Sequence, residues 1–368
     1  MNNGQVHVVE DLNEFLSLKE EWDALVAAME HPMPFFTHAW VRLWWDSFHE
    51  GRSLYIMTVR NEGRLKGILP LLRMRCRTLK VFSLPCFHSL TNGHSLACNF
   101  ISAPGDLKEV LNAFKTHLVN NNHDWSMIVL GYIPTDFTIP SEVSQCFNNS
   151  GMCSFLEPRD GAYYIDIQGD FETFYCKLNA SFRDNRKNIA NRMARLGRVT
   201  FEVVKDYDQK AVQQFYDLED TGWKREGAIT IKSSAELARF YNNISQVFSG
   251  KHQFLLATLR VNGGAIASIY GIVFERTFYF LKLGVNYSNP EYKKFSPGQA
   301  ILYELIRYCF EQKMKRFDFY GACYPFEAHW TKTINRRATV LIFNRRNFLA
   351  NICISLKKAQ KVFNTLIN

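Results

Sequence analysis

TFYFLKLGV at 277–285, SPGQAILYELIRYCFEQKMK at 296–315 and RFDFY at 316–320 form the stretch that decides the fold. The first and last segments have the aromatic, β-branched character of strands. The middle segment starts with Ser296-Pro297-Gly298, a typical helix start, and its apolar spacing predicts a helix over 300–312. Strand, helix and strand in succession indicate an α/β (α+β) unit.

The two strands carry polar side chains at unusual places. Alternation predicts that Lys282 shares one strand face with Phe278 and Phe280, where an unpaired ammonium would be costly to bury. The same rule puts Asp318 and Tyr320 together on one face of the second strand. Either these groups form a site, or Lys282 lies on an edge strand or pairs with Asp318.

A similar plan occurs in the first half of the chain. A strand–turn–strand pattern at 54–72 matches one at 254–274, and a helix predicted at 102–119 precedes a strand at 126–130. The matching landmarks lie about 200 residues apart, which indicates an internal duplication. In the first copy, Asp106 puts a carboxylate at the helix start, where it would repel a phosphate.

Composition narrows the class of protein. The chain has 368 residues, 47% of them hydrophobic, and a net charge of +9, which favours an anionic ligand such as a nucleotide, a nucleic acid or a membrane surface. The N-terminus lacks a signal-peptide pattern, and no stretch is apolar enough to span a membrane, so we expect a cytoplasmic protein. Nine cysteines without a C-x-x-C pair indicate reduced, mostly buried thiols, and no metal-binding motif is visible.

Two basic segments flank the second copy. Residues 182–198 predict an amphipathic helix, with Phe182, Ile189, Met193 and Leu196 on its apolar stripe. Residues 346–368 predict a basic surface helix, for which peripheral contact with anionic lipid is one alternative. The predicted domains are therefore 1–160, 161–345 and this C-terminal helix.

These motifs resemble the acetyltransferase domain of the GNAT superfamily, in the CelD-like group of cellulose biosynthesis, which is related to the FemAB peptidyltransferases. The residues that carry the resemblance are Lys282–Tyr287, Phe295–Gly298, Phe317–Gly321, His329–Lys332, Gly222-Trp223-Lys224 and the basic helix before the strand 199–204. The resemblance covers about residues 165–335. It implies tandem GNAT-like domains, each a mixed, mostly antiparallel sheet flanked by helices, the first of them degenerate.

The resemblance also implies a function, an N-acyltransferase that moves an acyl group, such as acetyl, from acyl-CoA to an amine by direct attack. Acyl-CoA would be a co-substrate, and no cofactor is permanently bound. Acyl transfer to an amine needs a base and donors to the thioester oxygen, for which the candidates are Asp318, Glu327, Lys282 and Tyr320. His329 is a further candidate base, although we expect it to have no catalytic role.

The remaining assignments concern binding. We expect the donor phosphates at a helix start with nearby positive charge, made by Ser296, Pro297, Gly298, Gln299 and Lys294. We expect the acceptor, a small molecule or a glycan or peptidoglycan-type amine, to be bound by Arg183, Arg186, Trp223, Trp330 and Lys332. The usual longer glycine-rich GNAT loop is missing, so an acyl-carrier protein remains an alternative donor. The rival functions are FemAB-like aminoacyl transfer from charged tRNA to a cell-wall precursor, and a non-catalytic binding protein of polysaccharide biosynthesis.

Overall fold

The computed structural model describes residues 4–78, 82–121, 125–135, 139–148, 151–221 and 229–367. The chain divides into two compact units. Unit 1 comprises Met1–Asp160 and Arg336–Asn368, and unit 2 comprises Gly161–Asn335. None of the helices in the described ranges is both long and apolar enough to cross a membrane.

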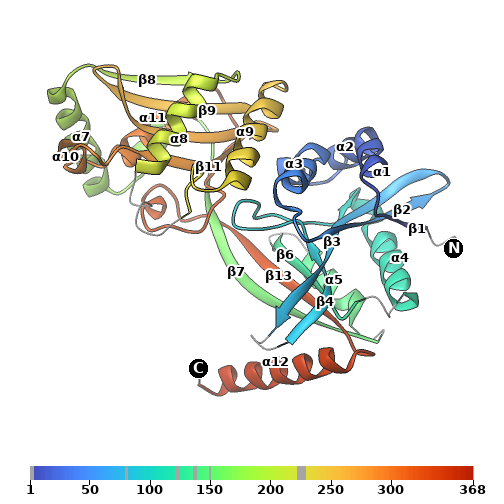
Figure 1. Cartoon of the computed structure of the whole chain (residues 1–368). Helices are drawn as coiled ribbons and strands as arrows, with labels where there is room; N and C mark the ends of the chain where they lie inside the picture. The colour runs from blue at the N-terminus through green and yellow to red at the C-terminus, as the bar shows by residue number, and fades with distance from the viewer. Residues whose placement is uncertain are drawn as a thin grey trace. The chain divides into compact units, whose positions relative to one another are not determined.

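Unit 1 contains a sheet with helices on it (Figure 1). Its elements are β1 (Gln5–Val9), α1 (Leu12–Ser17), α2 (Lys19–Ala27), η1 (Pro34–Phe36), α3 (His38–Phe48), β2 (Ser53–Asn61), β3 (Arg64–Thr78), β4 (Phe82–Ser89), β5 (Ile101–Ser102), η2 (Pro104–Asp106), α4 (Leu107–Asn120), β6 (Met127–Pro134), α5 (Ile139–Phe147), most of β7 (Met152–Asp166), most of β13 (Ile334–Asn344) and α12 (Phe348–Ile367). The strand order is β1-β2-β3-β4-β6-β13-β7. β4 and β6 are parallel, and the pairs β1–β2, β2–β3, β3–β4 and β6–β13 are antiparallel.

Unit 2 repeats this arrangement. Its elements are α6 (Phe171–Cys176), α7 (Ala180–Leu196), β8 (Val199–Val204), α8 (Gln209–Thr221), α9 (Ala235–Ser249), β9 (Phe254–Val261), β10 (Gly264–Phe274), β11 (Thr277–Val285), α10 (Pro290–Lys293), α11 (Pro297–Glu311), β12 (Arg316–Asp318) and η4 (Glu327–His329). The order is β7-β12-β11-β10-β9-β8, with β11 and β12 parallel and the pairs β7–β12, β11–β10, β10–β9 and β9–β8 antiparallel. The predicted mixed, mostly antiparallel sheet is confirmed.

The hairpin turns fold as their sequences predict. Glu62 and Gly63 have φ values of 50° and 76°, and Asn262 and Gly263 have 51° and 79°. Consecutive left-handed residues match the right-handed twist of the strands, and glycine and asparagine adopt them readily. The result is the pair of hairpins β2–β3 and β9–β10.

The two faces of the unit 2 sheet are covered by different helices. Leu283 packs with the core cluster that contains most of the apolar side of α11, and Gly298 of α11 faces Leu283. Gly284 points the other way, because a Cβ there would lie 2.9 Å from Leu218 of α8. Tyr270 likewise contacts Tyr241 of α9. α7 and α11 therefore cover one face, and α8 and α9 cover the other.

Three expectations need correction. β11 is irregular opposite Tyr270 and Gly271, so Lys282 does not share a face with Phe280; its ammonium lies 5.5 Å from the ring centre of Tyr241 on the α8–α9 face. A disulfide joins Cys76 to Cys86, because the paired strands β3 and β4 bring the two thiols together. The chain leaves unit 2 after Asn335, not after residue 345, because β13 pairs with β6 of unit 1.

Candidate active site at the start of two helices

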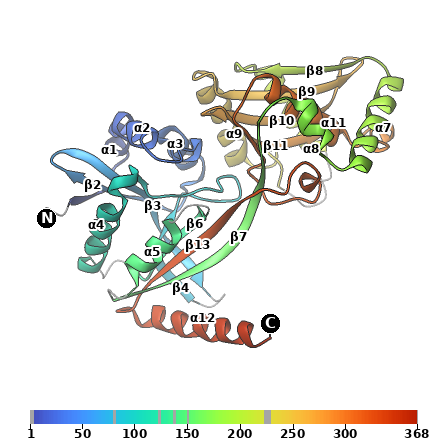
Figure 2. The same ribbon diagram turned by 180° about the vertical axis from the view of Figure 1, so that it is seen from behind.

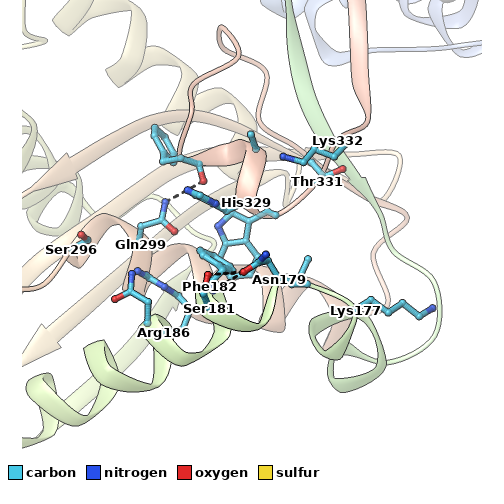
Figure 3. Close-up of a pocket in the computed structure, with 15 residues that line it drawn as sticks. Lys177, Asn179, Ser181, Phe182, Arg186, Ser296, Gln299, His329, Thr331 and Lys332 are labelled. Carbon is cyan, nitrogen blue, oxygen red and sulfur yellow. Dashed lines mark hydrogen bonds between the residues drawn. The ribbon is translucent and has the colours of Figure 1, made fainter.

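The start of α11 opens into a cavity of about 680 Å³. Ser296 is the N-cap residue, but its side chain makes no capping hydrogen bond, and both Ser296 and Gln299 line the cavity (Figure 3). Pro297 and Gly298 are buried instead, with Gly298 facing Leu283 and Val285. The first turn of α11 thus directs the positive end of its helix dipole toward this space.

The start of α7 forms a second wall of the same cavity. Asn179 caps α7 by accepting a hydrogen bond from the Phe182 backbone N–H at 3.3 Å, and Ser181 Oγ donates to Asn179 Oδ1 at 2.7 Å (Figure 3). The helix begins two residues earlier than predicted. Asn179 is a strong N-cap residue and was the signal in the sequence for this wall. Two helix N-termini meeting at one cavity favour an anion.

Arg186 adds a fixed positive charge to the cavity. It is only 6% exposed, and neither Nε nor Nη1 has a hydrogen-bond partner among the residues that the structure describes. Burial lowers the pKa of the Arg186 guanidinium to about 10, so it stays protonated at neutral pH. A buried cation without a counter-ion destabilises the folded chain. This cost is expected where a bound anion supplies the missing counter-ion.

The segment 326–332 closes the third wall. His329, which we did not expect to be functional, lines the cavity and stacks on Phe182 at 5.1 Å. Trp330 is buried beside it. Trp330 Nε1 and Gln299 Oε1 are both buried and have no hydrogen-bond partner within the described ranges. Lys332 also lines the cavity and is exposed. The predicted residues Ser296, Gln299, Arg186, Trp330 and Lys332 are therefore gathered at one site.

β11 and β12 separate after a short parallel pairing. They pair only from Thr277–Arg316 to Tyr279–Asp318, after which β11 continues to Val285 and the chain after β12 stays with β7 through the Phe319 N–H bond to the Tyr163 carbonyl. Phe317 and Phe319 belong to the α7–α11 core, so Asp318 and Tyr320 lie on the α8–α9 face, together as predicted.

Asp318 holds the turn that follows β12. Its Oδ1 accepts the Tyr320 backbone N–H at 2.8 Å, and its Oδ2 accepts Asn335 Nδ2 at 2.6 Å. Tyr320 has a φ of 56°, which is uncommon for a side chain of this size. Both oxygens of Asp318 are thus engaged in holding local structure, which suits a positioning role better than proton transfer.

Glu327 is a better candidate base. Its Oε2 accepts the Tyr324 backbone N–H at 3.2 Å, whereas Oε1 is buried with no partner in the described part of the chain. Burial raises the pKa of this carboxyl to about 8, with the nearby Asp318 adding to the shift and the Tyr324 N–H opposing it. A carboxyl group with a pKa near neutral pH is suited to general acid–base catalysis.

Several other predicted residues do not line this cavity. Lys282 lies on the α8–α9 face, and Lys294 is exposed and ion-paired with Glu291, outside the cavity lining. Arg183 lines a second cavity of about 420 Å³ between α7 and α11, which shares Arg186 with the first. Trp223 lies outside the described residues.

A comparison with protein families matches most of unit 2. Residues 180–328, which run from the start of α7 through η4, match the family described as Acetyltransferase (GNAT) domain. Unit 2 contains a GNAT domain. The predicted resemblance to this family is confirmed. No curated protein matches the sequence significantly.

Solved structures show that the tandem fold is shared. A crystal structure of FemX has a TM-score of 0.59 at 12% identity, over 89% of this chain and 96% of that chain. A tandem GNAT protein from the clavulanic acid biosynthesis pathway has a TM-score of 0.51 at 10% identity, over 93% and 99%. A conserved protein of unknown function from Bacteroides thetaiotaomicron VPI-5482 has a TM-score of 0.53 at 11% identity, over 92% and 100%. At these identities the likeness concerns the fold alone.

Proposed function

We propose that the GNAT domain transfers an acyl group from acyl-CoA to an amine acceptor. The observation that carries the proposal is the cavity in which the open start of α11 meets the buried Arg186, whose Nε and Nη1 lack a hydrogen-bond partner among the described residues. The pyrophosphate of CoA is the kind of anion that backbone N–H groups at a helix start and an arginine bind together. Ser296, Gln299 and Lys332 would complete its surroundings.

The chemistry would take place where β11 and β12 separate. The acceptor amine attacks the thioester carbonyl, the C–N bond forms, the C–S bond breaks, and the CoA thiolate leaves. Glu327 accepts the proton of the attacking amine. Tyr320 and Lys282, which approach from the α8–α9 face, would donate to the carbonyl oxygen as it becomes negative. Asp318 would position Tyr320 through the 2.8 Å bond to its backbone.

Calorimetric titration with CoA tests the donor site. Arg186→Gln should weaken CoA binding about 10-fold or more, since a charge-assisted hydrogen bond contributes roughly 1.5–3 kcal/mol. The same variant should unfold at a higher temperature than wild type without ligand, because it removes an unpaired buried charge. Arg195→Gln, an exposed position on the same helix, is the matched control and should change neither. Equal CoA affinity for all three proteins, or none for wild type, would remove the donor assignment.

The exposed basic face of α7 favours a second candidate, aminoacyl transfer from charged tRNA. Lys187, Arg192 and Arg195 are exposed on this helix. A tRNA would engage many phosphates, and its binding should weaken by orders of magnitude between low and moderate salt, whereas CoA offers few phosphates. Retention of tRNA on filters at increasing salt separates the two. Tight, steeply salt-dependent retention that Lys187→Glu/Arg195→Glu removes would favour the tRNA donor.

A further inference from the structure

The C-terminal helix α12 packs some of its apolar side chains and exposes others, as its described residues up to 359 show. Ala350, Cys353 and Ile354 are buried in a core cluster with residues of β4, β6, β7 and β13 in unit 1. Figure 2 shows α12 running beside β4. Phe348 is 77% exposed, Leu349 37% and Leu356 46%. The described part of the helix therefore exposes large apolar side chains, where solvent-facing positions of a helix are normally polar.

The exposed residues form one stripe. At about 100° per residue, the exposed Phe348, Leu349 and Leu356 and the half-buried Ile352 fall within about 100° of the helix circumference, beside the buried set. The sequence continues the same spacing at 359, 363 and 366 with alanine, phenylalanine and leucine. Single exposed apolar side chains are common, but a continuous stripe indicates a surface that is covered by something.

The charge around the stripe identifies the kind of surface that covers it. Residues 345–368 contain five basic and no acidic residues, namely Arg345, Arg346, Lys357, Lys358 and Lys361. Lys357 pairs with Glu157 of β7, whereas Arg345, Arg346 and Lys358 are exposed. Two like-charged copies of this helix would repel each other if paired, but an anionic lipid surface would attract it.

We propose that α12 docks unit 1 on the surface of an anionic membrane. The packed face stays on the sheet, the stripe of Phe348, Leu349, Ile352 and Leu356 enters the boundary between headgroups and acyl chains, and the basic residues contact lipid phosphates. A helix that is apolar on one side and basic at its flanks lies in the interface and does not cross it. The proposal is independent of the acyl-transfer assignment.

Co-sedimentation of the full chain with lipid vesicles tests this proposal. One set of vesicles is phosphatidylcholine alone, and in the other about a third of the lipid is phosphatidylglycerol. Wild type should bind the anionic vesicles at least about 10-fold more tightly, and added salt should weaken that binding. Phe348→Ser/Leu356→Ser should lose it, and Arg345→Gln/Arg346→Gln/Lys358→Gln should lose the preference for anionic lipid.

Control variants distinguish vesicle binding through the stripe from nonspecific hydrophobic binding. Leu156→Ser changes another exposed leucine of unit 1, 48% exposed on β7, and should bind as wild type does. Circular dichroism and melting temperature verify that each variant is folded. Wild type that binds neither vesicle, or a stripe variant that binds normally, would overturn the proposal. A dimer in sedimentation velocity that the stripe variant dissolves would also overturn it, because it would assign the stripe to a second copy.

Discussion

The two units contain the same strand–helix–strand element, but the charge near the start of its helix is negative in unit 1 and positive in unit 2. In unit 1, α4 connects the parallel strands β4 and β6, and Asp106 just before the helix is ion-paired with Lys66 at 3.1 Å. In unit 2, α11 connects β11 and β12, and its start is uncapped and opens into the cavity with Arg186. In unit 1, the position at the helix start where an anion could bind is therefore already occupied by the carboxylate of Asp106. We therefore expect donor binding in unit 2 only.

The largest expected effect concerns the chemistry in unit 2. Glu327→Gln keeps the shape of the side chain but cannot accept a proton, so turnover with a competent acceptor should fall about 100-fold or more. In wild type, kcat/KM should rise with pH and level off above about 8, the pKa to which burial raises Glu327, and this limb should vanish in the variant. Glu311→Gln, at the exposed far end of α11, is the control. Near-normal turnover in a folded Glu327→Gln protein would remove Glu327 from the mechanism.

The same carboxyl should make the stability of the protein depend on pH. The pKa of Glu327 is about 8 in the folded chain and near its ordinary value of 4.5 in the unfolded chain, so between these values the folded state holds a proton that the unfolded state releases. Stability should therefore fall as pH rises from about 4.5 to 8 and change no further from this group above 8. Urea unfolding at both ends of this window should show a smaller difference for Glu327→Gln than for wild type.

The second test transfers the unit 1 feature into unit 2. Ser296→Asp places a carboxylate at the start of α11, as Asp106 does at α4, and should weaken CoA binding about 10-fold or more through repulsion. Aspartate is a good N-cap residue, so the fold should be kept. Ser296→Asn, neutral and of the same shape, should bind CoA nearly as wild type does. If aspartate and asparagine behave alike in calorimetry, charge at this helix start does not decide donor binding.

Gly298 is less suitable for this test than its sequence suggests. A Cβ at Gly298 would lie 3.2 Å from Leu283, so a carboxylate there would disturb the packing of α11 on β11. Loss of CoA binding in Gly298→Asp would therefore report a packing defect as readily as repulsion. Sequence reasoning located the helix start correctly but could not show which of its residues face the cavity.

Features with a local cause were predictable from the sequence. The hairpins follow from Glu62-Gly63 and Asn262-Gly263, and the bounds of β8, β9 and β11 match the predicted strands. The predicted alternation was wrong beyond Phe280, where β11 is irregular opposite Tyr270 and Gly271. This irregularity depends on the strand with which β11 pairs, which the sequence of a single strand does not reveal. The disulfide between Cys76 and Cys86 depends on the pairing of β3 with β4 in the same way.

The site was predictable only in part for a similar reason. Asp318 and Tyr320 share a face because alternation along one strand determines it. The start of α7 at Asn179 meets the start of α11 only through tertiary packing, so the cavity and the unpaired nitrogens of Arg186 could not be derived from spacing. Likewise, the raised pKa of Glu327 comes from burial, which the position of a single glutamate in the sequence does not reveal.

The smallest expected effect lies in unit 1, where Asp106→Asn removes the carboxylate from the start of α4. Turnover and CoA affinity should stay within about twofold of wild type, and stability should fall by only about 0.2–1 kcal/mol, because the pair with Lys66 is partly exposed. Asp46→Asn, which breaks an exposed i,i+4 pair with Arg42, is the matched control for stability. The informative quantity is the stoichiometry of CoA binding in calorimetry, which should remain about one per chain because neutralising Asp106 supplies neither a cavity nor a buried arginine. A second CoA bound to Asp106→Asn would contradict this explanation, since it would mean that the Asp106 carboxylate alone prevents unit 1 from binding CoA.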